Sequence, residues 1–291
     1  MGQFKSKILS SLTLCLVLLG LTACSGAYGN RVETAEGIAN SSSMAGSLLR
    51  TEPFHLYSYQ AISPENKSGK AFTSAKQYRA RIFIEGDGLT WLTKSQISPD
   101  PTPIDPMGLK MASRDCSVNR IYLARPCHYV GIEKQPLCTP LFWVSELYND
   151  DVVRSYMQAL DNLKERYKFE EFELVGYSGG AVIATRLAAM RDDVILLFTV
   201  AGNLDTEGFV EHHGVTPYDQ HVNPTTIARQ INIPQIHFTG ANDDVISGFL
   251  SKNFVRNLRD KDKARIIEVE GMEHNGNWPS VWSSRVSCPN T

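Results

Sequence analysis

The sequence predicts an α/β protein with a mostly parallel central sheet covered by helices on both faces. Strand-like and helix-like segments alternate through the second half of the chain, and one such pair is joined by a glycine turn that contains a serine. The 291 residues, 42% of them hydrophobic, are enough for the core of one sizeable domain. The net charge of −2 gives no basic footprint, so we expect no nucleic-acid partner. The successive elements begin at Phe172, Ala181, Val194, Thr225, Ile233, Val245 and Ala264.

The amino terminus has the pattern of a secretory signal. Two lysines precede an uncharged apolar segment over residues 8–23, as in the n-region and h-region of a signal peptide. An uncleaved membrane anchor and ordinary secretion are the alternatives, but the segment is short for a membrane span. Residues 21–24 (Leu-Thr-Ala-Cys) resemble a bacterial lipobox. This resemblance implies that residues 1–23 are a lipoprotein signal peptide and that Cys24 carries a lipid.

The lipobox resemblance also implies a place in the cell. A lipid on the mature amino terminus would anchor the protein in the cell envelope, facing the periplasm. Ser25, rather than an aspartate, follows the cysteine, which favours the outer membrane over the inner one. Residues 24–50 are expected to form the lipidated terminus, a tether and a weak helix, and residues 51–291 the folded domain. The weak helix is indicated by apolar residues at helical spacing, namely Val32, Ala35, Ile38 and Ala39.

An oxidising compartment favours disulfide bonds between the remaining cysteines. One of the six leaves with the signal and one would carry the lipid, so four remain, namely Cys116, Cys127, Cys138 and Cys288. Three pairings are possible, and free thiols are the alternative. The short loop from Cys127 to Cys138 is the easiest to close, which leaves Cys116 with Cys288. Because no C-x-x-C pair occurs, we expect no zinc site.

The first part of the domain supplies strands, a short helix and one long helix. Alternating residues predict strands near Phe54 and over 79–85, and residues 119–124 are also strand-like. A short helix is expected near residues 107–112, and an irregular insertion over 126–144. Apolar residues along one face predict a long amphipathic helix over 149–167.

The most informative motif is Gly-Tyr-Ser-Gly-Gly at residues 176–180. It lies between a strand-like run and a run of helix formers, and its small residues let the chain turn sharply, so that the hydroxyl of Ser178 leaves the sheet. The alternative is a plain glycine turn, since G-x-S-x-G occurs by chance in roughly one such chain in ten. The flanking strand and helix favour a nucleophile.

Two later loops offer the partners that a serine nucleophile requires. A hydroxyl needs an imidazole to take its proton, and the imidazole needs a carboxylate to hold its tautomer. Asp243 comes after the strand-like run 233–239, with Asp244 as its rival, and His274 follows the alternating run 264–270. Both loops are expected at the carboxyl edge of the sheet, where ligands bind.

Together these motifs resemble the α/β-hydrolase superfamily over about residues 54–282. The resemblance rests on the turn at Ser178, the Gly-x-x-Asp segment from Gly240 and the Gly-x-x-His segment from Gly271. It implies an α/β-hydrolase domain in which Ser178 is the nucleophile and His274 the general base. Asp243 would orient the base, because it falls three residues after Gly240 as in the family pattern.

The same resemblance places an oxyanion hole. One backbone N–H group is expected from Gly179, the residue after the nucleophile. The second is assigned to Asp87, because Gly-Asp-Gly at residues 86–88 looks like the family's His-Gly-x-Gly loop. The chain departs from that pattern at Glu85, which stands in the place of the usual histidine.

Four further residues are candidates for a substrate pocket, namely Trp91, Tyr177, Asn203 and Trp278. Trp91 follows the oxyanion loop and Trp278 follows the base, although both could equally fill the core. Asn203 follows a hydrophobic strand, where a turn-forming role is equally possible. Four other histidines are interpreted as structural. His237 is expected in the core, and three are expected at the surface or at helix caps, namely His212, His213 and His221.

The resemblance therefore implies a serine hydrolase that needs no cofactor. It would transfer the acyl group of a small molecule, most simply a carboxylic ester, to Ser178 and then to water. Its membrane contact would be the amino-terminal lipid, and protein partners are not indicated. Two alternatives remain open at this point: a serine peptidase or amidase, and a non-catalytic binding or envelope-assembly lipoprotein on the same fold.

Overall fold

The computed structural model describes residues 30–68 and 78–286. The predicted signal peptide, Cys24 with its predicted lipid, and Cys288 lie outside the described residues, so the pairing of Cys116 with Cys288 stays a prediction. Among the described residues, no helix has both the length and the apolar character to cross a membrane.

A central sheet of eight strands organises the described chain, in the order β1-β2-β6-β3-β7-β8-β9-β10. The six strands from β6 to β10 run parallel to their neighbours, and β1 and β2 are antiparallel at one edge. The strands are β1 (Ala45–Leu49), β2 (Leu56–Ala61), β3 (Arg79–Ile84), β6 (Arg120–Leu123), β7 (Glu171–Tyr177), β8 (Val194–Val200), β9 (Gln235–Gly240) and β10 (Ala264–Val269). This is the mostly parallel sheet that the alternating segments predicted.

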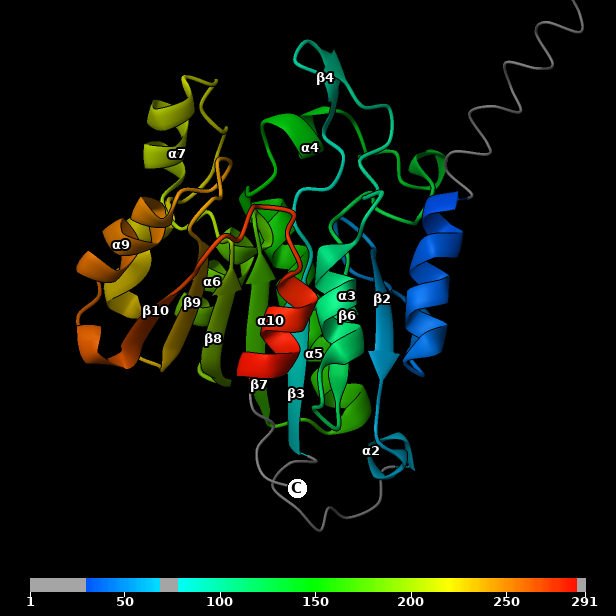
Figure 1. Ribbon diagram of the computed structural model, residues 1–291. Coiled ribbons are helices and arrows are strands. Elements are labelled where there is room, and N and C mark those ends of the chain that lie inside the picture. Colours follow the sequence, from blue (N-terminus) through cyan, green and yellow to red (C-terminus); the bar gives the residue numbers. More distant parts are fainter. Residues whose placement is uncertain (1–29, 69–77, 287–291) are drawn as a thin grey trace, which may run out of the picture.

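Helices cover both faces of the sheet (Figure 1). On one face, α5 (Asp150–Tyr167) and α6 (Gly180–Met190) pack against a core that includes Leu174 and Ile82. On the other face lie the helix over residues 30–41, α3 (Met107–Arg114) and α10 (Trp278–Arg285), which bury Phe83 and Val175. The central strand β8 is covered on both faces, which explains why it reads as a continuous apolar run, whereas β3 alternates. The other helices are α2 (Pro64–Ser68), α4 (Leu141–Val144), α7 (Thr206–His213), α8 (Pro224–Ile227) and α9 (Gly248–Arg256).

The folded unit begins earlier than residue 51, where the sequence placed the domain boundary. The expected helix is present over residues 30–41, and β1 then pairs antiparallel with β2. Only Leu49 of this strand is fully buried. A half-exposed edge strand has no clear apolar alternation, which is why the segment was expected to be only a tether and a weak helix.

The segments that follow β3 and β6 rise above the sheet at the carboxyl ends of the strands. After β3 comes a hairpin of β4 (Trp91–Thr93) and β5 (Gln96–Ile97), and after β6 comes the insertion that holds α4. A disulfide bond joins Cys127 to Cys138 in this insertion, as the short loop predicted. The indole of Trp143 on α4 donates a hydrogen bond to the carbonyl of Ser98 at 3.0 Å, so α4 is attached to the segment after β5.

Candidate active site

Ser178 lies at a sharp turn between the end of β7 and the start of α6. Its backbone has φ 51°, in the left-handed region that is unusual for a residue other than glycine. The backbone around Ser178 is packed so closely that the neighbouring residues must be small. A Cβ atom on Gly176 would lie 2.5 Å from the backbone of Ala181, and one on Gly180 would collide with the carbonyl of Ile84. The serine is thus held on the strained turn that the glycine motif predicted.

The structure brings Ser178, His274 and Asp243 together at the carboxyl edge of the sheet. Nε2 of His274 lies 3.1 Å from Oγ of Ser178, and Nδ1 lies 3.0 Å from Oδ2 of Asp243. Asp243 is buried, whereas its rival Asp244 is exposed. The other oxygen of Asp243 accepts hydrogen bonds from the backbone N–H groups of Val245 and Ile246. With that carboxylate ionised, Nδ1 holds the ring proton and Nε2 is free to accept the serine proton.

Two aromatic residues, Tyr177 and Trp278, hold the loop of His274. The ring of Tyr177 stacks on the imidazole with 5.5 Å between ring centroids, and its hydroxyl donates to the carbonyl of His274 at 3.0 Å. The indole of Trp278 donates to the same carbonyl at 2.8 Å. Both side chains are buried. The polar atoms of Tyr177 and Trp278 therefore position the base, and their contact with substrate stays a prediction.

Asn203 and Trp91, the other two pocket candidates, lie in different surroundings. Asn203 is buried, and its backbone N–H donates to the carbonyl of Ser178 at 3.1 Å, so it fixes the turn of the nucleophile. Its Oδ1 has no hydrogen-bond partner among the described residues. Trp91 lies on the β4–β5 hairpin and is 41% exposed. It is therefore placed above the site and at the surface.

The two expected oxyanion donors lie next to each other. The carboxylate of Asp87 occupies the space that a side chain on Gly179 would fill. It is held there by Nη1 of Arg125 at 2.8 Å and by the hydroxyl of Tyr148 at 2.8 Å. Within the described residues, neither the backbone N–H of Asp87 nor that of Gly179 donates a hydrogen bond to another residue. Both N–H groups are thus without an acceptor in the described part of the chain.

Glu85, which replaces the histidine of the family pattern, supports this loop from below. Its buried carboxylate accepts hydrogen bonds from the backbone N–H groups of Gly86 at 3.0 Å and Gly108 at 3.1 Å. Gly108 belongs to the first turn of α3, where a carboxylate satisfies otherwise unpaired N–H groups. Burial raises the pKa of Glu85 to about 7, although these hydrogen bonds oppose the shift.

Three residues of this region carried no recognisable sequence signal: Arg125, His128 and Tyr148. His128 is buried beneath the glycine of the oxyanion loop, since a Cβ atom on Gly88 would lie 2.8 Å from its ring. Burial, and then the charge of Arg125, lower the pKa of His128 to about 3, so the ring is neutral. These residues follow β6 or lie near the start of α5, and only the fold brings them to the site. No spacing rule could have found them.

The remaining histidines lie where a structural role is expected. His237 is buried in β9, burial lowers its pKa to about 3, and its Nδ1 lies 2.9 Å from the hydroxyl of Thr199. His221 lies 2.9 Å from the hydroxyl of Thr206, and His212 and His213 are exposed near the end of α7. Over residues 30–68 and 78–286, no group of three metal-ligating side chains is assembled.

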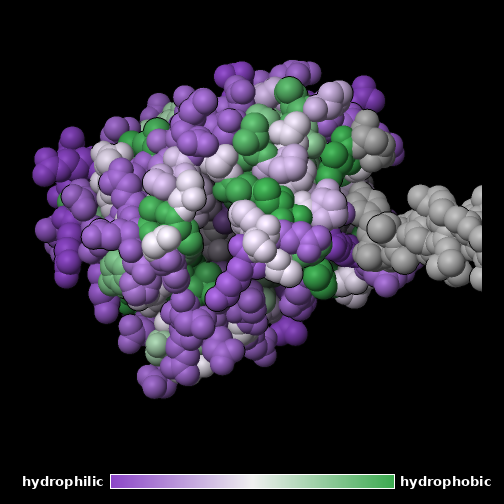
Figure 2. Space-filling view, turned by 90° about the horizontal axis from the view of Figure 1, so that it is seen from above, coloured by the Kyte–Doolittle hydropathy of each residue, from purple (hydrophilic) through white to green (hydrophobic). Residues whose placement is uncertain are grey.

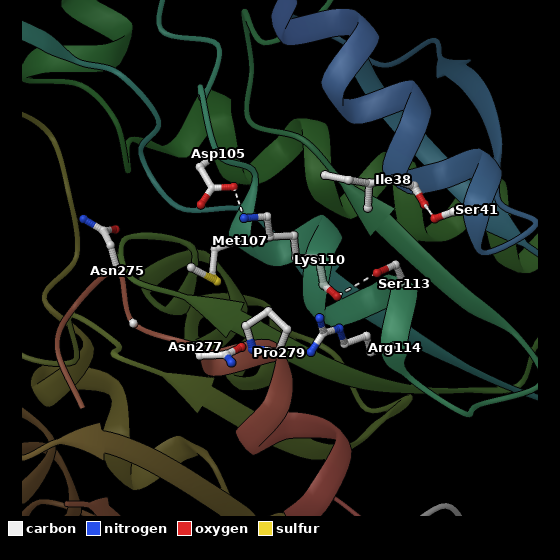
Figure 3. A pocket seen from close by; sticks show the side chains of 11 residues that line it. Ile38, Ser41, Asp105, Met107, Lys110, Ser113, Arg114, Asn275, Asn277 and Pro279 are labelled. Carbon is white, nitrogen blue, oxygen red and sulfur yellow. Dashed lines mark hydrogen bonds and ion pairs between the residues drawn. The ribbon is translucent and has the colours of Figure 1, made fainter. Parts of the chain in front are cut away.

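A cavity of about 520 Å³ lies beside the loop of the base, between α3, α10 and the helix over residues 30–41 (Figure 3). Lys110 enters it and forms an ion pair with Asp105. Asn275 lines the cavity, and its side-chain oxygen accepts a hydrogen bond from the hydroxyl of Tyr177. Ser178, His274 and Asp243 do not line this cavity, so it is separate from the reacting groups.

Comparisons with known proteins agree with this geometry. The family model for serine hydrolase (FSH1) matches residues 134–275, a little under half of the chain and the part that contains Ser178, Asp243 and His274. A search of curated proteins gave no significant match. The family match together with the fold identifies the protein as a serine hydrolase.

Solved structures with the same fold are similar over most of this chain. An alpha-beta serine hydrolase homologue from Coxiella burnetii is 13% identical with a TM-score of 0.55, and the match covers 84% of this chain and 97% of that one. Est1E from Butyrivibrio proteoclasticus, with ferulic acid bound, is 12% identical with a TM-score of 0.56, over 82% and 96%. The esterase Pf2001 of Pyrococcus furiosus is 12% identical with a TM-score of 0.56, over 83% and 89%. The chain therefore has the α/β-hydrolase fold.

Proposed function

We propose that the protein is a lipid-anchored serine hydrolase of the periplasm that cleaves a carboxylic ester through an acyl-enzyme on Ser178. The observation that carries the proposal is the hydrogen-bonded series of Asp243, His274 and Ser178, with 3.0 Å and 3.1 Å between the successive atoms. The named esterases among the structures of the same fold support an ester as the substrate class.

In the first half-reaction, Oγ of Ser178 attacks the carbonyl carbon of the ester while Nε2 of His274 takes the hydroxyl proton. Asp243 stays ionised and stabilises the imidazolium that forms. The backbone N–H groups of Gly179 and Asp87 receive the negative charge that develops on the carbonyl oxygen. The bond to the alcohol oxygen then breaks, and His274 returns its proton to the departing alcohol.

The second half-reaction uses the same groups on water. His274 takes a proton from a water molecule, whose oxygen attacks the acyl carbon bound to Ser178. The acyl–Oγ bond breaks, and Ser178 recovers a proton from His274. One ester and one water thus give one carboxylic acid and one alcohol, and the protein returns to its starting state without a cofactor.

A fluorophosphonate probe on fractionated cells tests both the chemistry and the anchor. We expect stoichiometric labelling that is lost in Ser178→Ala and kept in the matched variant Ser283→Ala, whose hydroxyl is on the exposed face of α10. The labelled protein should sediment with membranes, and Cys24→Ser should release it or block its processing. A folded wild-type protein that takes no label would favour the non-catalytic alternative. Faster cleavage of aminoacyl amides than of p-nitrophenyl esters would favour an amidase.

A further inference from the structure

The exposed apolar side chains of this protein gather at one end of the molecule. Of eleven large hydrophobic residues with substantial exposure in the described chain, eight lie on segments that follow the carboxyl ends of parallel strands. Figure 2 looks down on this end, and apolar residues surround its central hollow. We call these eight residues the apolar rim: Trp91, Leu92, Ile97, Ile104, Leu137, Leu141, Val215 and Val245.

The apolar rim flanks Ser178 on both sides. In the order of the sheet, β7 lies between β3 and β8. The segments after β3 and β6 carry the rim residues of one side, from Trp91 to Leu141, and the segments after β8 and β9 carry Val215 and Val245. Any apolar surface that covers this end of the molecule therefore also covers the end of β7, where Ser178 follows.

The hairpin carries three residues of the apolar rim, Trp91, Leu92 and Ile97. Trp91 pairs with Ile97 across it, and every residue of β4 and β5 is exposed. A two-stranded hairpin that keeps its apolar side chains in water is only marginally stable, so such a hairpin needs something to cover it. Tryptophan is also the residue that most favours the boundary between water and a bilayer.

The chain enters the described structure at the same end. Nη1 of Arg31 donates to the carbonyl oxygens of Asp100 and Thr102, which follow the hairpin, at 3.1 Å and 3.0 Å. From there the helix over residues 30–41 runs to the opposite end of the strands. At that end the carbonyl of Ser42 accepts a hydrogen bond from Arg120 at the start of β6. Cys24 is only six residues before the first described residue. Even a fully extended chain of that length spans about 20 Å.

We propose that the apolar rim docks on the lipid bilayer and that Ser178 receives its ester from the membrane surface. The inference rests on the proposed lipidation of Cys24 and on the proposed esterase activity. A lipid held within about 20 Å of the rim end keeps the bilayer on that side of the molecule. The substrate class is then an acyl ester of a lipid, reached from the headgroup region.

The fluorescence of Trp91 gives a direct test. Trp143, Trp278 and Trp282 are each 3% exposed or less, so only Trp91 is accessible to a quencher. The protein with its lipid attached is placed in phosphatidylcholine vesicles that carry a doxyl quencher on the acyl chain near the headgroup. We expect quenching that is lost in Trp91→Phe. The matched water-soluble quencher acrylamide should lose access to Trp91 when vesicles are present.

The outcomes separate this inference from the proposed function. Protein that sediments with the vesicles without doxyl quenching of Trp91 would overturn docking while leaving the anchor intact. Failure to sediment would contradict the anchor itself. Protection of Trp91 in native envelopes, but not in protein-free vesicles, would show that another protein covers the rim, and bilayer docking would be rejected.

A kinetic comparison tests the consequence for substrate. The readout is the ratio of hydrolysis of a methylumbelliferyl ester held in vesicles to that of soluble p-nitrophenyl acetate. Two apolar side chains withdrawn from water contribute at least a tenfold change in partitioning, so Leu92→Ser with Leu141→Ser should lower the ratio about tenfold. Met190→Ser is the matched control, since Met190 is 56% exposed at the far end of α6. An equal ratio in the two variants would refute delivery from the membrane.

Discussion

Asp87 combines two roles in one residue, because its backbone and its side chain face different partners. The backbone N–H has no acceptor in the described chain, while the carboxylate is bound by Arg125 and Tyr148 and lies against Gly179. The side chain thereby sets the spacing of the two expected oxyanion donors. A glycine after the nucleophile is required here, since the carboxylate takes the space of its side chain.

The substitution Gly179→Ala tests this arrangement. The new methyl group would collide with the carboxylate of Asp87, which Arg125 and Tyr148 prevent from moving aside. Loss of one aligned oxyanion donor costs roughly 10²–10³-fold in kcat, so we expect a fall of about 10²-fold with little change in KM. Steady-state kinetics on a p-nitrophenyl ester measure it, with circular dichroism to check folding.

The double variant Asp87→Ala, Gly179→Ala is the control. Removal of the carboxylate makes room for the methyl group, so part of the lost kcat should return. The same change leaves Arg125 as a buried charge without its partner, which should lower the free energy of unfolding by about 3 kcal/mol. If Gly179→Ala alone kept full activity, Asp87 would not set the spacing of the donors.

Site residues that belong to a sequence motif could be predicted, whereas site residues outside any motif could not. The order of Ser178, Asp243 and His274 and the glycine spacing were sufficient to select side chains that do lie together. Arg125 and Tyr148 reach the site through tertiary contacts, which no local pattern encodes. The hydrogen bond from the indole of Trp278 to the carbonyl of His274 could not be predicted either, because only packing decides where an aromatic residue after the base lies.

Among the elements, α3 is joined to the predicted oxyanion loop by the buried carboxylate of Glu85. Glu85 ends the strand-like run of β3, and its oxygens accept from the backbone of Gly108 in the first turn of α3. Burial raises the pKa of this group in the folded state to about 7. The helix start and the loop are therefore coupled through a group that titrates near neutrality.

The raised pKa predicts how stability depends on pH. Below about 4.5 the carboxyl is protonated in both states, and above about 7 it is ionised in both. Between these values the unfolded chain ionises first, so the folded state loses stability as pH rises, by about 3 kcal/mol in all. In Glu85→Gln this contribution is absent. The wild type should therefore lose about 3 kcal/mol of unfolding free energy relative to Glu85→Gln when the pH rises from 4.5 to 8.

Urea unfolding at several pH values measures this difference. Glu65→Gln is a suitable control, because Glu65 lies in the first turn of the short helix α2 and only Asn66 of that helix is buried. A constant difference between wild type and Glu85→Gln across the range would mean that the carboxyl at position 85 does not titrate between pH 4.5 and 7.

Long periodic elements were predictable and short exposed ones were not. The long amphipathic helix shows its period, and the parallel strands carry enough apolar residues to be recognised as strands. The β4–β5 hairpin has no buried face and thus no pattern. The helix α10 carries Trp278 and Trp282 four residues apart, on one face, but eight residues are too few to distinguish that spacing from a loop.

At the scale of the whole molecule, the sheet is completed by residues that the sequence assigned to a tether. The helix over residues 30–41 packs Ala35 and Ala39 into the core between the sheet, α3 and α10. Met44, directly before β1, and Leu49, the last residue of β1, are also buried. Without this segment, β2 would become an open edge of the sheet, with its hydrogen-bonding groups unpaired.

A chain that begins at residue 51 should therefore be much less stable than one that begins at residue 30. Loss of these buried apolar side chains removes about 5 kcal/mol, which for a domain of this size lowers Tm by about 10–20 °C. The open edge of β2 should also make the shorter chain aggregate on heating. Differential scanning fluorimetry and light scattering on the two chains measure these effects. Equal Tm values would show that the helix and β1 are dispensable, and the boundary at residue 51 would stand.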